Sequence, residues 1–121
     1  MIVTTARPME TPNAALASLA TPSLGSTEIC TWRITMQPGA QGPVHAIDRE
    51  QVWLPLTGEL AFTVDGETMS VPAGQAAILP AGEVRQVAVV AGPVQAVVCM
   101  AVGGHATVPG SADRHPLPWA E

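Results

Sequence analysis

The sequence has no lysine and no tyrosine, and its five basic residues stand against ten acidic ones. Without a basic patch it has little with which to neutralise phosphates, so we expect no nucleic-acid partner. No apolar run approaches the roughly 18 residues that a membrane span needs, and the first residues carry no basic segment leading into an apolar one. We therefore expect a cytoplasmic protein without membrane contacts.

Cysteine is also scarce, since Cys30 and Cys99 are the only two. Both stand in apolar stretches, where an unpaired cysteine behaves as a small buried hydrophobic residue. Neither has a histidine or arginine beside it in the sequence that would favour the thiolate. We interpret both as reduced core residues, with a reactive thiol as the alternative.

What the sequence does contain is apolar residues and turn residues. The apolar fraction is 47%, only 12% of residues are charged, and 11 glycines and 12 prolines interrupt the apolar runs. A chain of 121 residues forms one domain, and frequent Gly and Pro favour many short strands over a few long helices. These features predict a single all-β domain.

Several segments show the patterns of strands and turns. Cys30, Trp32, Ile34 and Met36 alternate with more polar residues, as expected for a strand with one buried face. Asp65-Gly66 tolerates the positive φ angles of a tight hairpin. Further strands are predicted over 51–64, with a break at 57–58, and over 69–71, 76–79, 84–90 and 94–102.

The two ends of the chain have a different composition. Residues 1–25 are rich in Pro, Thr, Ser and Ala, and predict an extended arm with little helix, the one helical alternative being 13–19. Residues 104–121 predict a Pro-rich tail. We expect a barrel core over about 26–103 within a single domain, 1–121.

The turn residues also fall at fixed spacings. One set is Gly39, His45, Ile47, Gln51 and Gly58, and fifteen residues later a second set comprises Gly74, Pro80, Gly82, Arg85 and Val89. These resemble the two motifs of the cupin family, Gly-x5-His-x-His-x3,4-Glu-x6-Gly and Gly-x5-Pro-x-Gly-x2-His-x3-Asn, at the short spacing of small single-domain bacterial cupins of the cupin 2 type. The resemblance implies a double-stranded β-helix, a jelly-roll-like barrel.

The metal-binding part of the motifs is degenerate. In metal-binding cupins three histidines and a glutamate converge on one ion, and here those positions hold His45, Ile47, Gln51 and Arg85. A catalytic metal needs about three good donors, whereas Ile47 offers none and Arg85 brings a fixed positive charge. We expect no metal and no cofactor, unless Glu50, His105 or His115 substitutes as a ligand.

The family geometry implies that the same positions form a ligand site in the barrel lumen. His45 and Arg85 are the candidate catalytic residues, for proton transfer and for holding an anion. The candidate ligand-binding residues are Gln51, Trp53, Trp32, Met36 and Ile47. An apolar cavity with a few converging polar groups is the usual form of a small-molecule site.

Each of these residues has a structural alternative. His45 is equally explained as a hydrogen-bonded core histidine, and Arg85 as the partner of Glu50 or Glu83 in an ion pair. The tryptophans are needed as core residues in a chain with four aromatics. A one-residue shift would turn Glu50 inward in place of Gln51.

We therefore expect a metal-independent, small-molecule-binding cupin for an anionic or enolisable ligand, with His/Arg acid-base chemistry of the isomerase, cyclase or dehydratase type. A non-catalytic binding or sensing module is the alternative, and a metal-dependent oxygenase is disfavoured. A homodimer is also expected, because an open barrel leaves sheet edges and apolar outer faces to cover.

Overall fold

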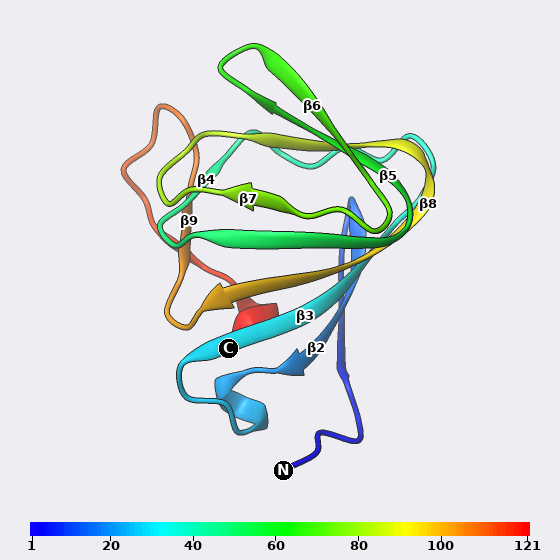
Figure 1. Cartoon of the computed structure of the whole chain (residues 1–121). Coiled ribbons are helices and arrows are strands. Elements are labelled where there is room, and N and C mark those ends of the chain that lie inside the picture. Colours follow the sequence, from blue (N-terminus) through cyan, green and yellow to red (C-terminus); the bar gives the residue numbers. More distant parts are fainter.

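The computed structural model describes residues 1–121 as a barrel of β-strands with almost no helix (Figure 1). The large sheet has the order β1 (Arg7–Thr11), β2 (Ala14–Ala20), β3 (Ile29–Met36), β8 (Gln86–Ala101), β5 (Gln51–Val64) and β6 (Glu67–Pro72), and β7 (Ala77–Leu79) also pairs with β5. A small sheet consists of β10 (His115–Pro116), β9 (His105–Thr107) and β4 (Ala46–Ile47). The 3-10 helices η1 (Pro22–Leu24) and η2 (Pro118–Ala120) complete the fold. Neither is long or apolar enough to cross a membrane.

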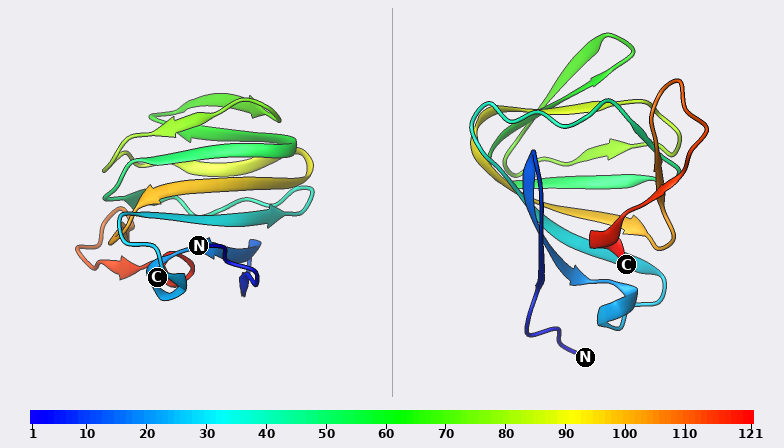
Figure 2. Two further views of the ribbon diagram at one scale, coloured as in Figure 1. Left: turned by 60° about the horizontal axis from the view of Figure 1, so that its bottom comes forward. Right: turned by 180° about the vertical axis from the view of Figure 1, so that it is seen from behind.

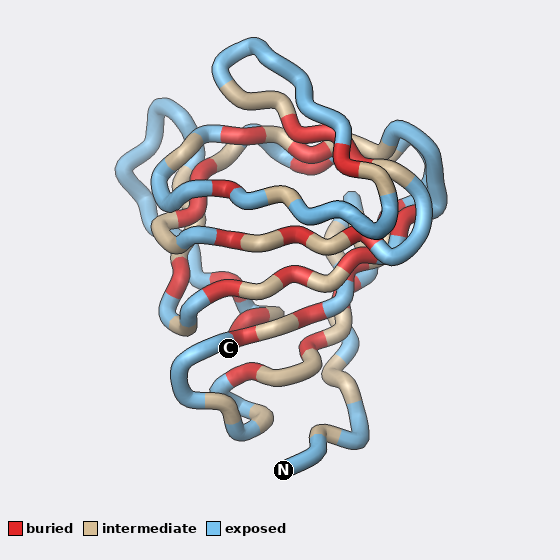
Figure 3. Tube along the Cα trace, in the orientation of Figure 1, coloured by how far each residue is buried: buried red, intermediate tan, exposed pale blue.

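Side chains alternate between the inside and the outside of the barrel, as the sequence pattern predicts. On β3, Cys30, Trp32, Ile34 and Met36 are all buried, and the residues between them are not. The same alternation runs along the neighbouring strands (Figure 3). The barrel interior is therefore lined by every second residue of its strands.

In two places, two short strands expected from the sequence form one long strand. Residues 51–64 form the single strand β5, and β8 spans both 84–90 and 94–102 in large part. The pairing register between β5 and β8 shifts near Gly58, where both strands bend together. Gly58 has a φ of +73°, and a Cβ there would clash with the carbonyl oxygen of Ala91. A glycine thus bends the paired strands without breaking them.

The barrel closes where the loop after β3 meets the first half of β8. The Gly42 N–H donates to the carbonyl of Val87 at 2.9 Å, and the Val89 N–H donates to that of Ala40 at 3.0 Å. His45 and Arg85 exchange both backbone hydrogen bonds, at 3.1 and 2.9 Å. This bridge places the two motif residues directly opposite each other at the rim of the lumen.

The N-terminal segment differs from the extended arm that its composition suggested. Residues 7–20 form a β-hairpin, and its second strand adds to the edge of β3, so that 13–19 is strand and not helix. The C-terminal residues lie beside this hairpin (Figure 2). The Ser18 hydroxyl donates to the carbonyl of Trp119 at 2.6 Å, and Arg7 Nη2 donates to that of Pro118 at 3.0 Å. Backbone pairing to β3 thus imposes a strand that local composition does not specify.

Candidate functional site

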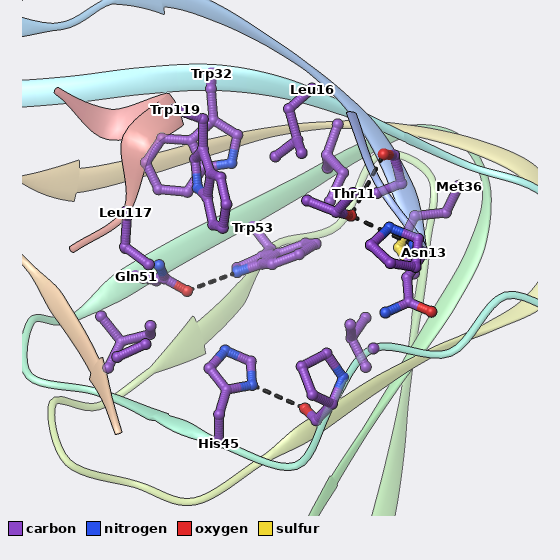
Figure 4. A pocket seen from close by; sticks show the side chains of 18 of the residues that line it. Thr11, Asn13, Leu16, Trp32, Met36, His45, Gln51, Trp53, Leu117 and Trp119 are labelled. Atoms are coloured by element: carbon purple, nitrogen blue, oxygen red, sulfur yellow. Dashed lines mark hydrogen bonds between the residues drawn. The ribbon is translucent and has the colours of Figure 1, made fainter. Parts of the chain in front are cut away.

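A cavity of about 330 Å³ occupies the lumen of the barrel. Most of its lining is apolar, and its polar groups are few and face one another across the space (Figure 4). Six of the seven residues predicted for the ligand site line it: His45, Gln51, Trp53, Trp32, Met36 and Ile47. Arg85 is the exception.

The strands that carry these residues explain why they meet. Trp32 and Met36 lie on the inner face of β3, and Gln51 and Trp53 lie on the inner face of β5. Because residues two apart on a strand face the same side, each strand supplies its pair as a unit. Gln51 is only 4% exposed whereas Glu50 is exposed, so the glutamine faces the lumen and the acid faces solvent.

The Gln51 amide is held between two donors. Its Oε1 accepts from Trp53 Nε1 at 3.1 Å and from Arg85 Nη2 at 2.9 Å. Two donors can meet only the oxygen of an amide, so they also fix which end of the side chain is Nε2. That Nε2 lies 3.5 Å from the sulfur of Met100, a weak acceptor. Gln51 lines the cavity, and the second N–H of its amide has no protein acceptor.

Arg85 stands behind Gln51 and not in the lumen, which corrects the expected position of its side chain. It is 2% exposed, and its Nη1 donates to the backbone carbonyl of Glu83 at 3.0 Å. The anticipated ion pair with Glu50 or Glu83 does not form, since no carboxylate oxygen lies within 4.0 Å of the guanidinium. Burial lowers the pKa of Arg85 and the charge of Glu83 opposes this, but a guanidinium stays protonated. The cavity thus has an unneutralised positive charge behind its amide.

His45 presents one defined nitrogen to the cavity (Figure 4). Its Nδ1 lies 2.8 Å from the carbonyl of Pro43, and since a carbonyl only accepts, Nδ1 carries the proton in the neutral ring. Burial lowers the pKa of His45, and Arg85 adds to that effect while the hydrogen bond to Pro43 opposes it. The neutral imidazole therefore offers the lone pair of Nε2.

The residues present do not suit a catalytic metal. No group of three His, Cys, Asp or Glu side chains converges anywhere in the structure. At the four motif positions only His45 is a good donor, Ile47 has no donor atom, and Gln51 Oε1 already accepts two hydrogen bonds. The donor set fits hydrogen bonding to an organic molecule better than it fits coordination of an ion.

The remaining candidate residues lie outside the lumen. His105 joins Arg49 and Arg114 around the carboxylate of Asp48 on the surface, and His115 is exposed. Burial acts to raise the pKa of Asp48, but the His105 N–H and the two arginines outweigh it and hold that pKa low. Both cysteines are free thiols, but only Cys30 is a core residue, because Cys99 is half-buried on the other face of β8. Burial raises the pKa of Cys30, whose thiol donates to the Met100 carbonyl at 3.2 Å.

Sequence reasoning missed the part of the cavity wall that the chain termini supply. Thr11, Asn13 and Leu16 come from the N-terminal hairpin, and Leu117 and Trp119 come from the tail. Local patterns gave no signal for these contacts, which depend on the tail returning to β2. The isolated apolar Leu117 and Trp119 in a Pro-rich tail were the only hint that it packs against something.

Fold and cavity together define a class, that of small β-barrels with an apolar lumen and a few inward polar groups. A family model described as the cupin domain matches residues 32–103, more than half of the chain. The chain belongs to the cupin family, which confirms the resemblance seen in its turn motifs. Curated protein sequences give no significant match.

Solved structures share the fold at low sequence identity. KdgF from Halomonas sp. is 13% identical with a TM-score of 0.68, over 78% of this chain and 84% of that one. An RmlC-like cupin from Shewanella frigidimarina is 21% identical with a TM-score of 0.67, over 79% and 83%. Oxalate decarboxylase from Bacillus subtilis is 12% identical with a TM-score of 0.71, and the match covers 84% of this chain but 28% of that one. These likenesses confirm the all-β cupin barrel.

Proposed function

We propose that the chain is a metal-independent cupin that binds a small anionic or enolisable organic molecule in its lumen. The observation that carries the proposal is the pairing, in one cavity, of a proton acceptor with a donor. His45 Nε2 is the acceptor, and the Gln51 amide, backed by the charge of Arg85, is the donor. An enolisable ligand needs both groups, because one atom loses a proton while the neighbouring oxygen gains negative charge.

His45 is the acid-base group in this proposal. Its Nε2 takes a proton from a C–H group next to a carbonyl of the ligand, and the electron pair left behind moves through the carbonyl onto its oxygen. That oxygen accepts a hydrogen bond from the Gln51 amide. Return of the proton from His45 to a different carbon completes an isomerisation. In a cyclisation the enolate carbon bonds to a second carbonyl carbon of the same ligand, and His45 gives the proton to the alkoxide so formed. In a dehydration the proton goes to a hydroxyl that leaves the carbon next to the enolate, which releases water.

Arg85 is a positioning residue for this chemistry. Its hydrogen bond to Gln51 Oε1 fixes the orientation of the amide and polarises it, so that the Nε2–H group becomes a stronger donor. The positive charge favours an anion in the lumen although the guanidinium does not reach it. The role is the charge stabilisation expected for Arg85, exerted through Gln51.

The binding step is tested by thermal unfolding with a panel of small carboxylic and 2-oxo acids. A ligand at a hundred times its Kd stabilises the fold by about 2.7 kcal/mol. We expect at least one acid to raise the Tm of the wild type and of His115→Gln, an exposed control, with a smaller rise for His45→Gln. No rise with any member of the panel would contradict the proposal.

Catalysis has a separate readout. For the acids that bind, exchange of the ionisable C–H protons in D2O is followed by NMR. We expect the wild type to accelerate the exchange and His45→Gln to lose about 10²- to 10⁴-fold of that rate. Binding without exchange would support the non-catalytic binding or sensing module instead.

Metal independence has its own measurement. Elemental analysis of the purified protein is expected to find no stoichiometric transition metal, and chelation is expected to leave the Tm unchanged. About one metal ion per chain would contradict this. The homodimer also stays a prediction. Ile29, Leu56 and Ile78 expose apolar side chains on the outside of the large sheet, which supports it, and sedimentation tests it.

A further inference from the structure

All three tryptophans of the chain line the lumen. They come from three separate segments, Trp32 from β3, Trp53 from β5 and Trp119 from η2, and their rings face the same space (Figure 4). Phe62, the only other aromatic residue, packs edge-on against Trp53 with ring centroids 5.2 Å apart. Every aromatic ring thus lines the cavity or supports its wall, so flat apolar surface is concentrated where a ligand would lie.

Several hydrogen-bond donors of the cavity wall have no strong protein acceptor. Among the three indoles, only that of Trp53 donates to a protein acceptor. Only Arg7 Nε and Ser26 Oγ are both fully enclosed and without a hydrogen-bond partner. The Trp32 N–H also has no partner but is not fully enclosed, so it borders open space. Trp32 is 2% exposed, and the space beside it is the cavity. The Gln51 amide is a second donor, whereas the free acceptor at that end is His45 Nε2.

The charges around the cavity favour an anion over a cation. No aspartate or glutamate lines it, and the guanidinium of Arg85 lies directly behind Gln51 without a carboxylate partner. Tryptophan cages often hold quaternary ammonium groups, but such cages gain from an absence of nearby positive charge. Here the buried arginine opposes a cation and stabilises a carboxylate or enolate.

From these three features we propose that the lumen selects a flat, conjugated carboxylate. Its ring lies against the tryptophan faces, and its carboxylate accepts from the Gln51 amide at the Arg85 end. The proposal rests on the proposed function, since it names the ligand class of the same site, and it adds a ring-shape requirement that small aliphatic acids do not meet.

Intrinsic fluorescence gives a direct readout, because every tryptophan is in the cavity wall and the chain has no tyrosine. The probes are benzoate, cyclohexanecarboxylate, benzamide and phenyltrimethylammonium. Benzoate is expected to bind about five- to tenfold tighter than cyclohexanecarboxylate, the range that aromatic contacts supply. It should bind at least about tenfold tighter than benzamide, which lacks the charge, and phenyltrimethylammonium should bind weakest.

Two variants separate ring recognition from charge recognition. Trp119→Leu keeps an apolar cover but removes a flat face, so the benzoate preference over cyclohexanecarboxylate should fall towards one while that over benzamide persists. Gln51→Leu removes the amide donor, so the benzoate preference over benzamide should fall towards one while that over cyclohexanecarboxylate persists. Arg33→Met removes an exposed cation on the outer face of β3 and should change neither ratio.

The outcomes distinguish this inference from the proposed function. Equal affinity for benzoate and cyclohexanecarboxylate, or tighter binding of phenyltrimethylammonium, would overturn the ligand class and leave an acid-binding lumen intact. Failure of all four probes, together with no response to the panel of small acids, would overturn both. Binding of small aliphatic acids alone would overturn only the ring requirement.

Discussion

The cavity has two kinds of wall that are held in place differently. The barrel strands β3, β5 and β8 are joined by long backbone ladders, and β3 and β5 carry Trp32, Gln51 and Trp53. The terminal wall, with Leu117 and Trp119, is held to β1, β2 and η1 by a few side-chain hydrogen bonds and by the packing of Leu117 in the core. Gln51 lies on the strand wall, His45 lies in the loop that is bridged to Arg85 just before β8, and the terminal wall covers the cavity from the other side. Access for a ligand therefore costs least at the terminal segments.

The largest expected effect compares one tryptophan from each wall. Trp32→Ala removes an almost fully buried ring from the core, and we expect a loss of about 3–5 kcal/mol in the free energy of unfolding. Trp119 is only half-buried, so Trp119→Ala should cost about 1–2 kcal/mol. Urea unfolding measures both. Equal losses would show that the terminal wall is as integral to the fold as the strands.

The next prediction concerns the polar cluster of the barrel wall. Gln51→Leu leaves the Trp53 N–H and the Arg85 guanidinium without their acceptor, and we expect a loss of about 2–4 kcal/mol. In the double variant with Arg85→Met the buried charge is gone, and about 1 kcal/mol or more of that loss should be recovered. Losses that simply add in urea unfolding would contradict the coupling between these two side chains.

A smaller effect is expected at the terminal wall. Arg7→Met removes hydrogen bonds to the backbone oxygens of Pro118 and Glu121, at 3.0 and 2.8 Å. These bonds are on the surface, so the free energy of unfolding should fall by about 1 kcal/mol or less. Hydrogen exchange should accelerate in residues 117–121 and stay unchanged in β5. Acceleration in both segments would show that the two walls open together.

The smallest effect is the pH dependence contributed by His45. Its folded-state pKa lies below the ordinary value of 6.5, so the unfolded chain binds more protons between the two values. The free energy of unfolding is therefore unaffected by His45 above pH 6.5, and it falls as the pH drops from 6.5 through the lowered pKa of His45. His45→Gln should remove this part of the decline, while the low pKa of Asp48 acts only at more acidic pH. Identical pH profiles for the wild type and His45→Gln would contradict the assignment.

Much of the barrel wall was predictable from local patterns. Alternation on residues 30–36 predicted the inward positions of Trp32 and Met36. The cupin resemblance implied those of Ile47, Gln51 and Trp53, although the alternation left open whether Glu50 or Gln51 faces inward. The continuity of β5 and β8 was not predictable, because Gly and Pro occur both where a strand bends and where it ends. At Gly58 the strand bends and does not end, because β5 stays paired with β8 on both sides of the glycine.

The terminal wall and the polar cluster show what local patterns leave undetermined. Alternation places the backbone of Arg85 at the rim, but a long side chain can reach either the lumen or the space behind Gln51. The acceptors at Gln51 Oε1 and the Glu83 carbonyl draw it behind. Likewise the neutral tautomer of His45 depends on the carbonyl of Pro43, which the fold of the loop brings to 2.8 Å.

By itself, then, the sequence determined the strand periodicity, most of the turns and the inward face of β3, because these follow from the two-residue repeat of a strand and from the backbone angles open to glycine. Only the tertiary structure decided that Trp119 covers the lumen, that Arg85 donates to Gln51 and that His45 Nδ1 bonds to the carbonyl of Pro43. The first two outcomes depend on partners far apart in the chain, and no local period specifies where a side-chain end group finds its hydrogen bond.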